Sequence, residues 1–134
     1  MKKNVFLFIV LVVAAALLSV IGWYNQNNQV PSPSSLSTIK AKAEKGDAKA
    51  QYNLGLVYAK GQGVKQDSTE AINWLERAGV QGNAKAAFIL GEIYYTGTGT
   101  KKDYHMAAQW FDEACDNGSS EGCRMYQQLR AAGY

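Results

Sequence analysis

The apolar residues between Ala48 and Ala114 are spaced as in amphipathic α-helices, and the whole pattern occurs twice. The two copies lie 36 residues apart, so that Leu54 aligns with Leu90 and Trp74 aligns with Trp110. Apolar positions in the first copy follow a period of about 3.6 residues rather than 2. They are Ala50, Leu54, Leu56 or Val57, and Tyr58. Such a repeat is typical of stacked helical units, each too small to bury its own apolar face.

Residues that start and stop helices predict an all-α fold of six helices that alternate in direction. Asp47 and Asn83 can cap a helix, because their side-chain oxygens accept hydrogen bonds from the free amides of the first turn. Gly61 and Gly97 end those helices, since glycine readily adopts the left-handed conformation. The expected helices cover about 36–45, 48–60, 68–78, 84–95, 103–115 and 120–131, with either Asp67 or Ser68 and either Ser119 or Ser120 as caps.

A glycine recurs in the middle of the first helix of each copy, at Gly55 and Gly91. Glycine inside a helix costs about 1 kcal/mol relative to alanine. Together with Ala71, Gly55 lets the two helices of the first copy approach closely, and this contact explains why a glycine is kept there.

The amino-terminal residues 1–24 form either a membrane anchor or a secretory signal with its amino end in the cytoplasm. Lys2 and Lys3 precede an uncharged run, and the next charge along the chain is Lys40. The apolar core of this run is longer than the roughly 7–15 residues of a signal peptide, which favours an anchor. Cleavage after Gly22 stays an alternative.

A polar stretch that includes both prolines follows this segment, and residues 25–35 are expected to form a disordered or extended linker. The remaining residues, 36–134, are numerous enough for one domain. Excluding Lys2 and Lys3, the chain has 12 basic and 11 acidic residues, which give a net charge of +1. A nearly neutral domain lacks the basic footprint that nucleic acid requires.

The pattern A-x-A-x-x-x-L-G-x-x-Y-x-x-G-x-G-V-x-x-D-x-x-x-A-x-x-W-x-x-x-A resembles the Sel-one-like repeat, a relative of the tetratricopeptide repeat. It is matched in full from Ala48 to Ala78, and from Ala84 to Ala114 with Thr100 in place of the valine. The resemblance implies a right-handed α-α superhelix, a solenoid of antiparallel helix pairs. Its parts would be a cap helix at 36–45, repeats at 47–78 and 83–114, and a carboxy-terminal capping half-repeat at 115–134.

Two cysteines, Cys115 and Cys123, lie where the earlier copies have mostly small residues. Their spacing is compatible with a disulfide, with two free thiols or with a zinc site. A zinc site is disfavoured because zinc is usually bound by four ligands and His105 is the chain's one histidine. Cysteine-rich members of the resembled family bridge each helical hairpin at this spacing. The resemblance therefore implies a Cys115–Cys123 disulfide, which agrees with an oxidising compartment.

The resemblance also implies a partner-binding surface, because the first helix of each unit lines a concave groove in tetratricopeptide-like stacks. Carried over by position, the groove would contain Lys49, Tyr52, Asn53, Leu56, Lys60, Lys85, Phe88, Ile89, Glu92, Tyr95, Arg124 and Gln128. Aromatic and arginine side chains on a rigid surface are frequent anchors of binding. The alternative for Tyr52 and Phe88 is that they only pack between neighbouring units.

Candidate catalytic residues are few. Ser37 and Lys40 fit the S-x-x-K motif of penicillin-recognising serine enzymes, but they lie in the polar stretch and no S-D-N or K-T-G motif accompanies them. His105 has no second histidine or base beside it, and Asp112 and Glu113 point about 100° apart on a helix. Catalytic residues, a cofactor and a metal site are therefore not expected.

We expect a non-enzymatic protein-interaction module of the bacterial cell envelope that binds a protein or peptide partner. Its location would be the inner membrane, crossed once, with the repeat domain in the periplasm. If the amino-terminal segment is cleaved, the protein would be periplasmic or secreted. The alternative function is a β-lactamase-like or penicillin-binding-like enzyme, a description that some cysteine-rich relatives carry.

Overall fold

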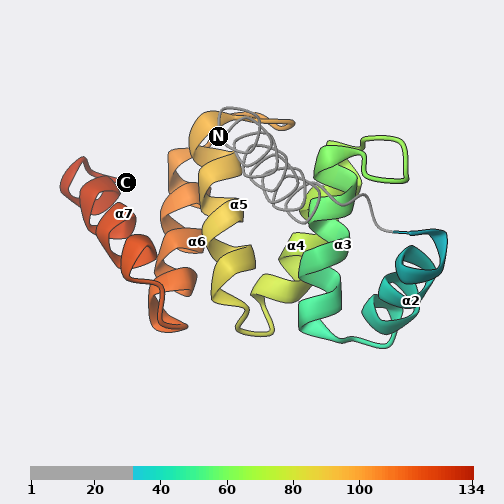
Figure 1. The fold of residues 1–134 in the computed structure, drawn as a ribbon. Helices are drawn as coiled ribbons and strands as arrows, with labels where there is room; N and C mark the ends of the chain where they lie inside the picture. Colours follow the sequence, from blue (N-terminus) through green and yellow to red (C-terminus); the bar gives the residue numbers. More distant parts are fainter. Residues whose placement is uncertain (1–31) are drawn as a thin grey trace, which may run out of the picture. The chain divides into compact units, whose positions relative to one another are not determined.

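The computed structural model describes residues 32–134, which contain six α-helices and no strand. The helices follow one another in a row, and each contacts the next along the chain (Figure 1). They are α2 (Pro33–Glu44), α3 (Ala48–Lys60), α4 (Ser68–Gly79), α5 (Ala84–Thr96), α6 (Tyr104–Asp116) and α7 (Ser120–Ala131). The expected all-α fold with six helices is confirmed for this part of the chain.

The expected anchor or signal at 1–24, and residues 25–31 of the expected linker, lie outside the described residues. Within residues 32–134, no helix combines the length and the hydropathy needed to cross a membrane.

Capping side chains begin the helices where the sequence predicts them. Asp47 accepts a hydrogen bond from the amide of Ala50 at 2.7 Å, and Asn83 accepts one from Ala86 at 3.0 Å. Where the sequence offers two alternative caps, the structure uses Asp67 for α4 and Ser119 for α7. Each bond satisfies an amide that the helix itself leaves free.

The first described helix, α2, starts earlier than expected. It begins at Pro33 rather than at residue 36, with Ser32 as its cap accepting from the amide of Ser35 at 3.2 Å. Proline suits the first helical position because its missing N–H would have no partner there. Residues 33–35 therefore belong to the helix and not to the linker, and Ser37 is helical as well.

The core consists of three groups of buried residues, each between successive helices. The central group joins the two copies of the repeat, since it combines Leu75 and Ala78 of α4 with Ala86 and Leu90 of α5. The other two groups are Ala43, Ala50, Leu54 and Val57, and Ala107, Ala108, Phe111 and Leu129. Neither copy buries its apolar face alone, as the repeat pattern predicts.

The mid-helix glycines mark close approaches between paired helices. A Cβ atom added at Gly55 would lie 2.7 Å from Cγ of Leu75, and one at Gly91 would lie 2.5 Å from Cδ1 of Phe111. Both partner side chains are fully buried. The glycines therefore make room for the largest core residues of the second helices.

The helix junctions at the aligned cysteine positions are closed in different ways. Between α2 and α3, the side-chain amide of Gln51 donates to the carbonyl of Ala43 at 3.0 Å. At the α6–α7 junction, Cys115 and Cys123 form a disulfide, with their Cα atoms 4.5 Å apart. The predicted disulfide is confirmed, and free cysteines are absent from the described residues.

Candidate binding surface on the first helices

All of the predicted partner-binding residues lie on α3, α5 and α7, and we call the non-core side of these helices the first-helix face. Seven of these residues are exposed: Lys49, Lys60, Lys85, Glu92, Tyr95, Arg124 and Gln128. Five are half-buried: Tyr52, Asn53, Leu56, Phe88 and Ile89. None belongs to the buried core, so all of them remain candidates for contact with a partner.

A hollow of about 440 Å³ lies on this face. It brings together four of the predicted residues, which are Tyr52, Lys85, Phe88 and Ile89. The rest of its lining is Ala84, Gly118, Ser119 and Glu121, which the sequence prediction did not include. We call this site the main hollow; its volume is in the range of pockets that take a small molecule or a few side chains.

Glu121 was missed although the repeat itself contains the signal. The 36-residue offset aligns Lys49, Lys85 and Glu121, so the third unit has an acidic residue where the first two have lysine. Ser119 aligns in the same way with the caps Asp47 and Asn83. The main hollow therefore includes the start of α7 as well as α3 and α5.

Other predicted residues line smaller hollows on either side. Lys49 and Asn53 belong to a hollow of about 220 Å³ shared with Thr38, Ile39 and Lys42 of α2. Tyr95 and Gln128 belong to another of about 270 Å³, together with Tyr104 and Tyr134. Leu56, Lys60, Glu92 and Arg124 lie elsewhere on the same three helices.

Tyr52 and Phe88 serve two purposes in the structure. Tyr52 packs against the central core group between the repeats, and the ring of Phe88 lies 5.4 Å from that of the buried Phe111. Both are nevertheless half-buried and line the main hollow. Packing between units thus holds in place two aromatic rings that also form part of a surface site.

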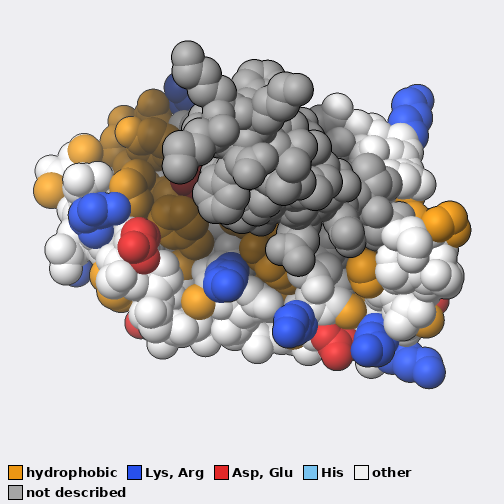
Figure 2. Space-filling view, viewed as in Figure 1, with side chains coloured by type: hydrophobic (Ala, Val, Ile, Leu, Met, Phe, Trp, Pro, Cys, Tyr) orange, Lys and Arg blue, Asp and Glu red, His pale blue; other side chains and the backbone are white. Residues whose placement is uncertain are grey.

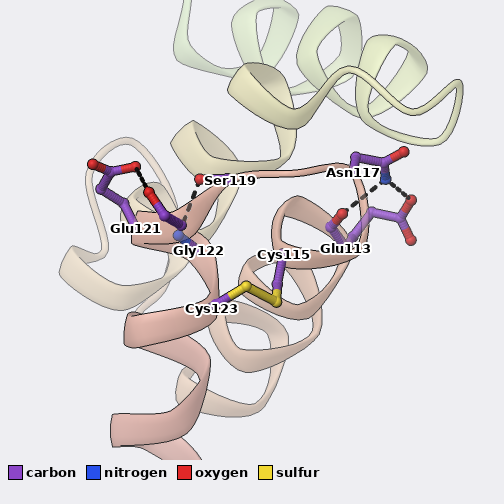
Figure 3. The surroundings of a disulfide bond; sticks show 8 residues. Glu113, Cys115, Asn117, Ser119, Glu121, Gly122 and Cys123 are labelled. Carbon is purple, nitrogen blue, oxygen red and sulfur yellow. Dashed lines mark hydrogen bonds between the residues drawn. A yellow bond between two sulfur atoms is a disulfide. The ribbon is translucent and has the colours of Figure 1, made fainter.

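The α6–α7 junction is fixed by more than the disulfide. Asn117 donates to the carbonyl and to the carboxylate of Glu113, both at 2.8 Å, and Ser119 accepts from the amide of Gly122 at 3.0 Å (Figure 3). Three residues of this junction, Gly118, Ser119 and Glu121, form one wall of the main hollow. That wall is therefore held by one covalent bond and three hydrogen bonds.

The acidic residue of the wall is ionised at neutral pH. Hydrogen bonds from its own backbone amide and from the hydroxyl of Ser120, at 3.0 Å, lower the pKa of Glu121 below its usual range. Lys85 lines the same hollow from α5. The main hollow thus combines apolar side chains with one basic and one acidic group.

The candidate catalytic residues Ser37 and Lys40 line one hollow of about 290 Å³, together with Pro33, Leu36 and Gly63. The hydroxyl of Ser37 donates to the carbonyl of Ser34 at 2.8 Å, and the ammonium of Lys40 lies 5.9 Å from the ring centre of Tyr58. His105 packs edge-on against Tyr134. Across residues 32–134 there is no group of three or more histidine, cysteine or acidic side chains that could bind a metal.

Antiparallel helix pairs at a 36-residue period, with a core shared between neighbours, define a short α-helical repeat protein. The Sel1 repeat model matches residues 48–83 and 84–119, which together are more than half of the chain. The chain belongs to the Sel1 repeat family, as the resemblance predicts. Sel1 repeats generally mediate interactions between proteins.

Solved structures of Sel1 repeat proteins have the same fold. A Sel1 repeat protein from Oxalobacter formigenes is 33% identical with a TM-score of 0.67, over 73% of this chain and 74% of that one. Cysteine rich protein B of Helicobacter pylori is 26% identical with a TM-score of 0.66, over 69% of each chain. A protective antigen of uropathogenic Escherichia coli is 33% identical with a TM-score of 0.65, over 74% of this chain and 22% of its own.

A curated relative matches a shorter segment. The secretory immunoglobulin A-binding protein EsiB of Escherichia coli O6:H1 is 46% identical over 44 residues. This match covers 33% of the chain and only 9% of EsiB, so the chain corresponds to a small part of that relative.

Proposed function

We propose that this protein is a binding module of the bacterial cell envelope that holds a partner protein or peptide on its first-helix face. The observation that carries the proposal is the main hollow, which collects Tyr52, Phe88 and Ile89 on a rigid scaffold. Aromatic side chains in such a hollow are suited to anchor a partner. Family membership supports a binding function, and the name of EsiB describes a protein-binding relative.

The proposal also places the repeat domain outside the cytoplasm. The Cys115–Cys123 disulfide is typical of oxidising compartments, and the predicted anchor or signal at 1–24 would deliver the domain there. We propose a single-pass inner-membrane protein with its repeats in the periplasm. Carbonate extraction of membranes tests the anchor, because a cleaved protein would be released into the soluble fraction.

Photo-crosslinking in living cells tests the binding face. A photoreactive amino acid replaces Lys85 or Gln128, both exposed on the first-helix face. In matched controls it replaces Asn73 or Gln109, which are exposed on α4 and α6. We expect a discrete crosslinked partner from the first two positions and only background from the controls.

Equal crosslinking from all four positions, or crosslinks only from α4 and α6, would contradict the proposed face. Circular dichroism of each variant shows whether the helices are intact. All four replacements are at exposed positions, so none removes a core residue.

A further inference from the structure

Positive charge is not distributed evenly over the described residues. Residues 32–134 have a net charge of +1. The charged residues of α3, α5 and α7, five basic and two acidic, sum to +3, so the other described residues sum to −2. They are Lys49, Lys60, Lys85, Arg124, Arg130, Glu92 and Glu121.

Three lysines line hollows on or beside this face. Lys42 of α2 and Lys49 of α3 line the smaller hollow beside α2, and Lys85 of α5 lines the main hollow. Of the two acidic residues, Glu92 belongs to α5, and Glu121 of α7 lines the main hollow with Lys85. Figure 2 shows lysine and arginine side chains spaced along the face, with fewer acidic ones among them.

Of the two acidic residues beside these lysines, Asp47 already caps a helix. Asp47 lines the smaller hollow, but its carboxylate caps α3 by accepting from the amide of Ala50 at 2.7 Å. The free amides at a helix start partly offset its negative charge. The track from Lys42 through Lys49 to Lys85, which we call the lysine track, has three positive charges beside the carboxylates of Asp47 and Glu121. Its charge is therefore positive, which favours negatively charged groups.

Tyr52 connects the lysine track to the main hollow. It follows Lys49 by three positions on α3, so the two side chains share one helix face. Phe88 and Ile89 follow Lys85 by three and four positions on α5 in the same way. Each lysine thus stands next to apolar side chains that line the hollow.

We propose that the first-helix face binds an extended acidic peptide, with one bulky apolar side chain in the main hollow and carboxylates over Lys49 and Lys85. This inference rests on the proposed function and names the chemistry of the partner. Charge complementarity selects the acidic segment, because a basic one would repel the lysines. The apolar contact with Tyr52 and Phe88 adds affinity that salt does not screen.

Fluorescence anisotropy with a synthetic probe tests the proposal. The probe is a fluorescein-labelled nine-residue peptide with one central phenylalanine between aspartates and glutamates, about 30 Å long when extended. The protein is the full chain, purified in a non-ionic detergent. We expect saturable binding that weakens as sodium chloride increases. A peptide with alanine in place of phenylalanine, and one with lysines in place of the acids, should each bind at least tenfold more weakly.

Matched charge reversals locate the site. Lys49→Glu with Lys85→Glu should reduce affinity about tenfold or more, since two attractions become repulsions. Lys65→Glu with Lys101→Glu changes the net charge by the same amount, at exposed positions in the loops before α4 and α6. That control should change affinity less than about twofold.

Equal loss in both double variants would overturn the proposal, because the binding would then follow net charge alone. Equal affinity for the acidic and the lysine-containing peptides would overturn it as well. If the acidic peptide does not bind but position 85 still crosslinks to a partner, the acidic partner is contradicted and the proposed function is not. Failure of both experiments would contradict the face itself.

Discussion

At the residue scale, Gly91 sets the distance between α5 and α6. Its missing side chain is the space that the ring of Phe111 fills, and Phe111 is also the partner of Phe88 beside the main hollow. One hydrogen in place of a methyl group therefore influences both the core and the surface site. The same arrangement recurs one repeat earlier with Gly55 and Leu75.

Gly91→Ala should destabilise the protein by about 1–3 kcal/mol, because overpacking a buried contact exceeds the gain of about 1 kcal/mol in helix propensity. Urea unfolding followed by circular dichroism measures the change. Combining it with Phe111→Leu, which makes room, should reveal favourable coupling between the two sites. A more stable Gly91→Ala protein would show that the contact between Gly91 and Phe111 can accommodate a methyl group without strain.

At the scale of elements, α7 depends on the junction with α6. It packs on α6 through Leu129, and the disulfide ties its first turn to the end of that helix. The disulfide therefore fixes the start of α7 relative to the end of α6.

Replacing both cysteines by serine should lower the free energy of unfolding by about 2.5 kcal/mol, the loop-closure value for so short a loop. Guanidinium unfolding of the oxidised protein and of the variant gives the difference. Reductant should destabilise the original chain and leave the variant unchanged. Two titratable thiols in the oxidised protein would instead show that the bond does not form.

At the scale of the whole described domain, the two repeats depend on one core group. Leu75 and Ala78 of the first repeat pack with Ala86 and Leu90 of the second. In repeat proteins, stability is a sum of unit and interface terms, and a strong interface makes neighbours unfold together. Two repeats and their caps should therefore behave as one cooperative unit.

Two tryptophans test this, since Trp74 belongs to α4 and Trp110 to α6. In both variants Trp23 is replaced by phenylalanine. One variant also replaces Trp74 and the other also replaces Trp110, so that each retains a single tryptophan as its fluorescent reporter. We expect each fluorescence midpoint in urea to coincide with the circular dichroism midpoint of the same protein. A fluorescence transition separated from the helical one in either variant would show that the repeats unfold independently.

Much of the fold could be predicted because it depends on short-range patterns. Caps such as Asp47 and stops such as Gly61 act within a few positions of the chain, so the alignment of the two copies located them. The start of α2 at Pro33 was missed because this helix has no complete unit before it for comparison. Its cap, Ser32, lies in the stretch whose composition suggested a linker.

The sequence by itself determined the repeat, the helix order and the residues that face away from the core, because helical periodicity separates buried from exposed positions. Only the tertiary structure decided which of those residues form the main hollow. Tyr52, Phe88 and Glu121 come from three helices, and their meeting depends on how α3, α5 and α7 pack. Packing joins residues that are distant in the chain, and no local pattern records that geometry.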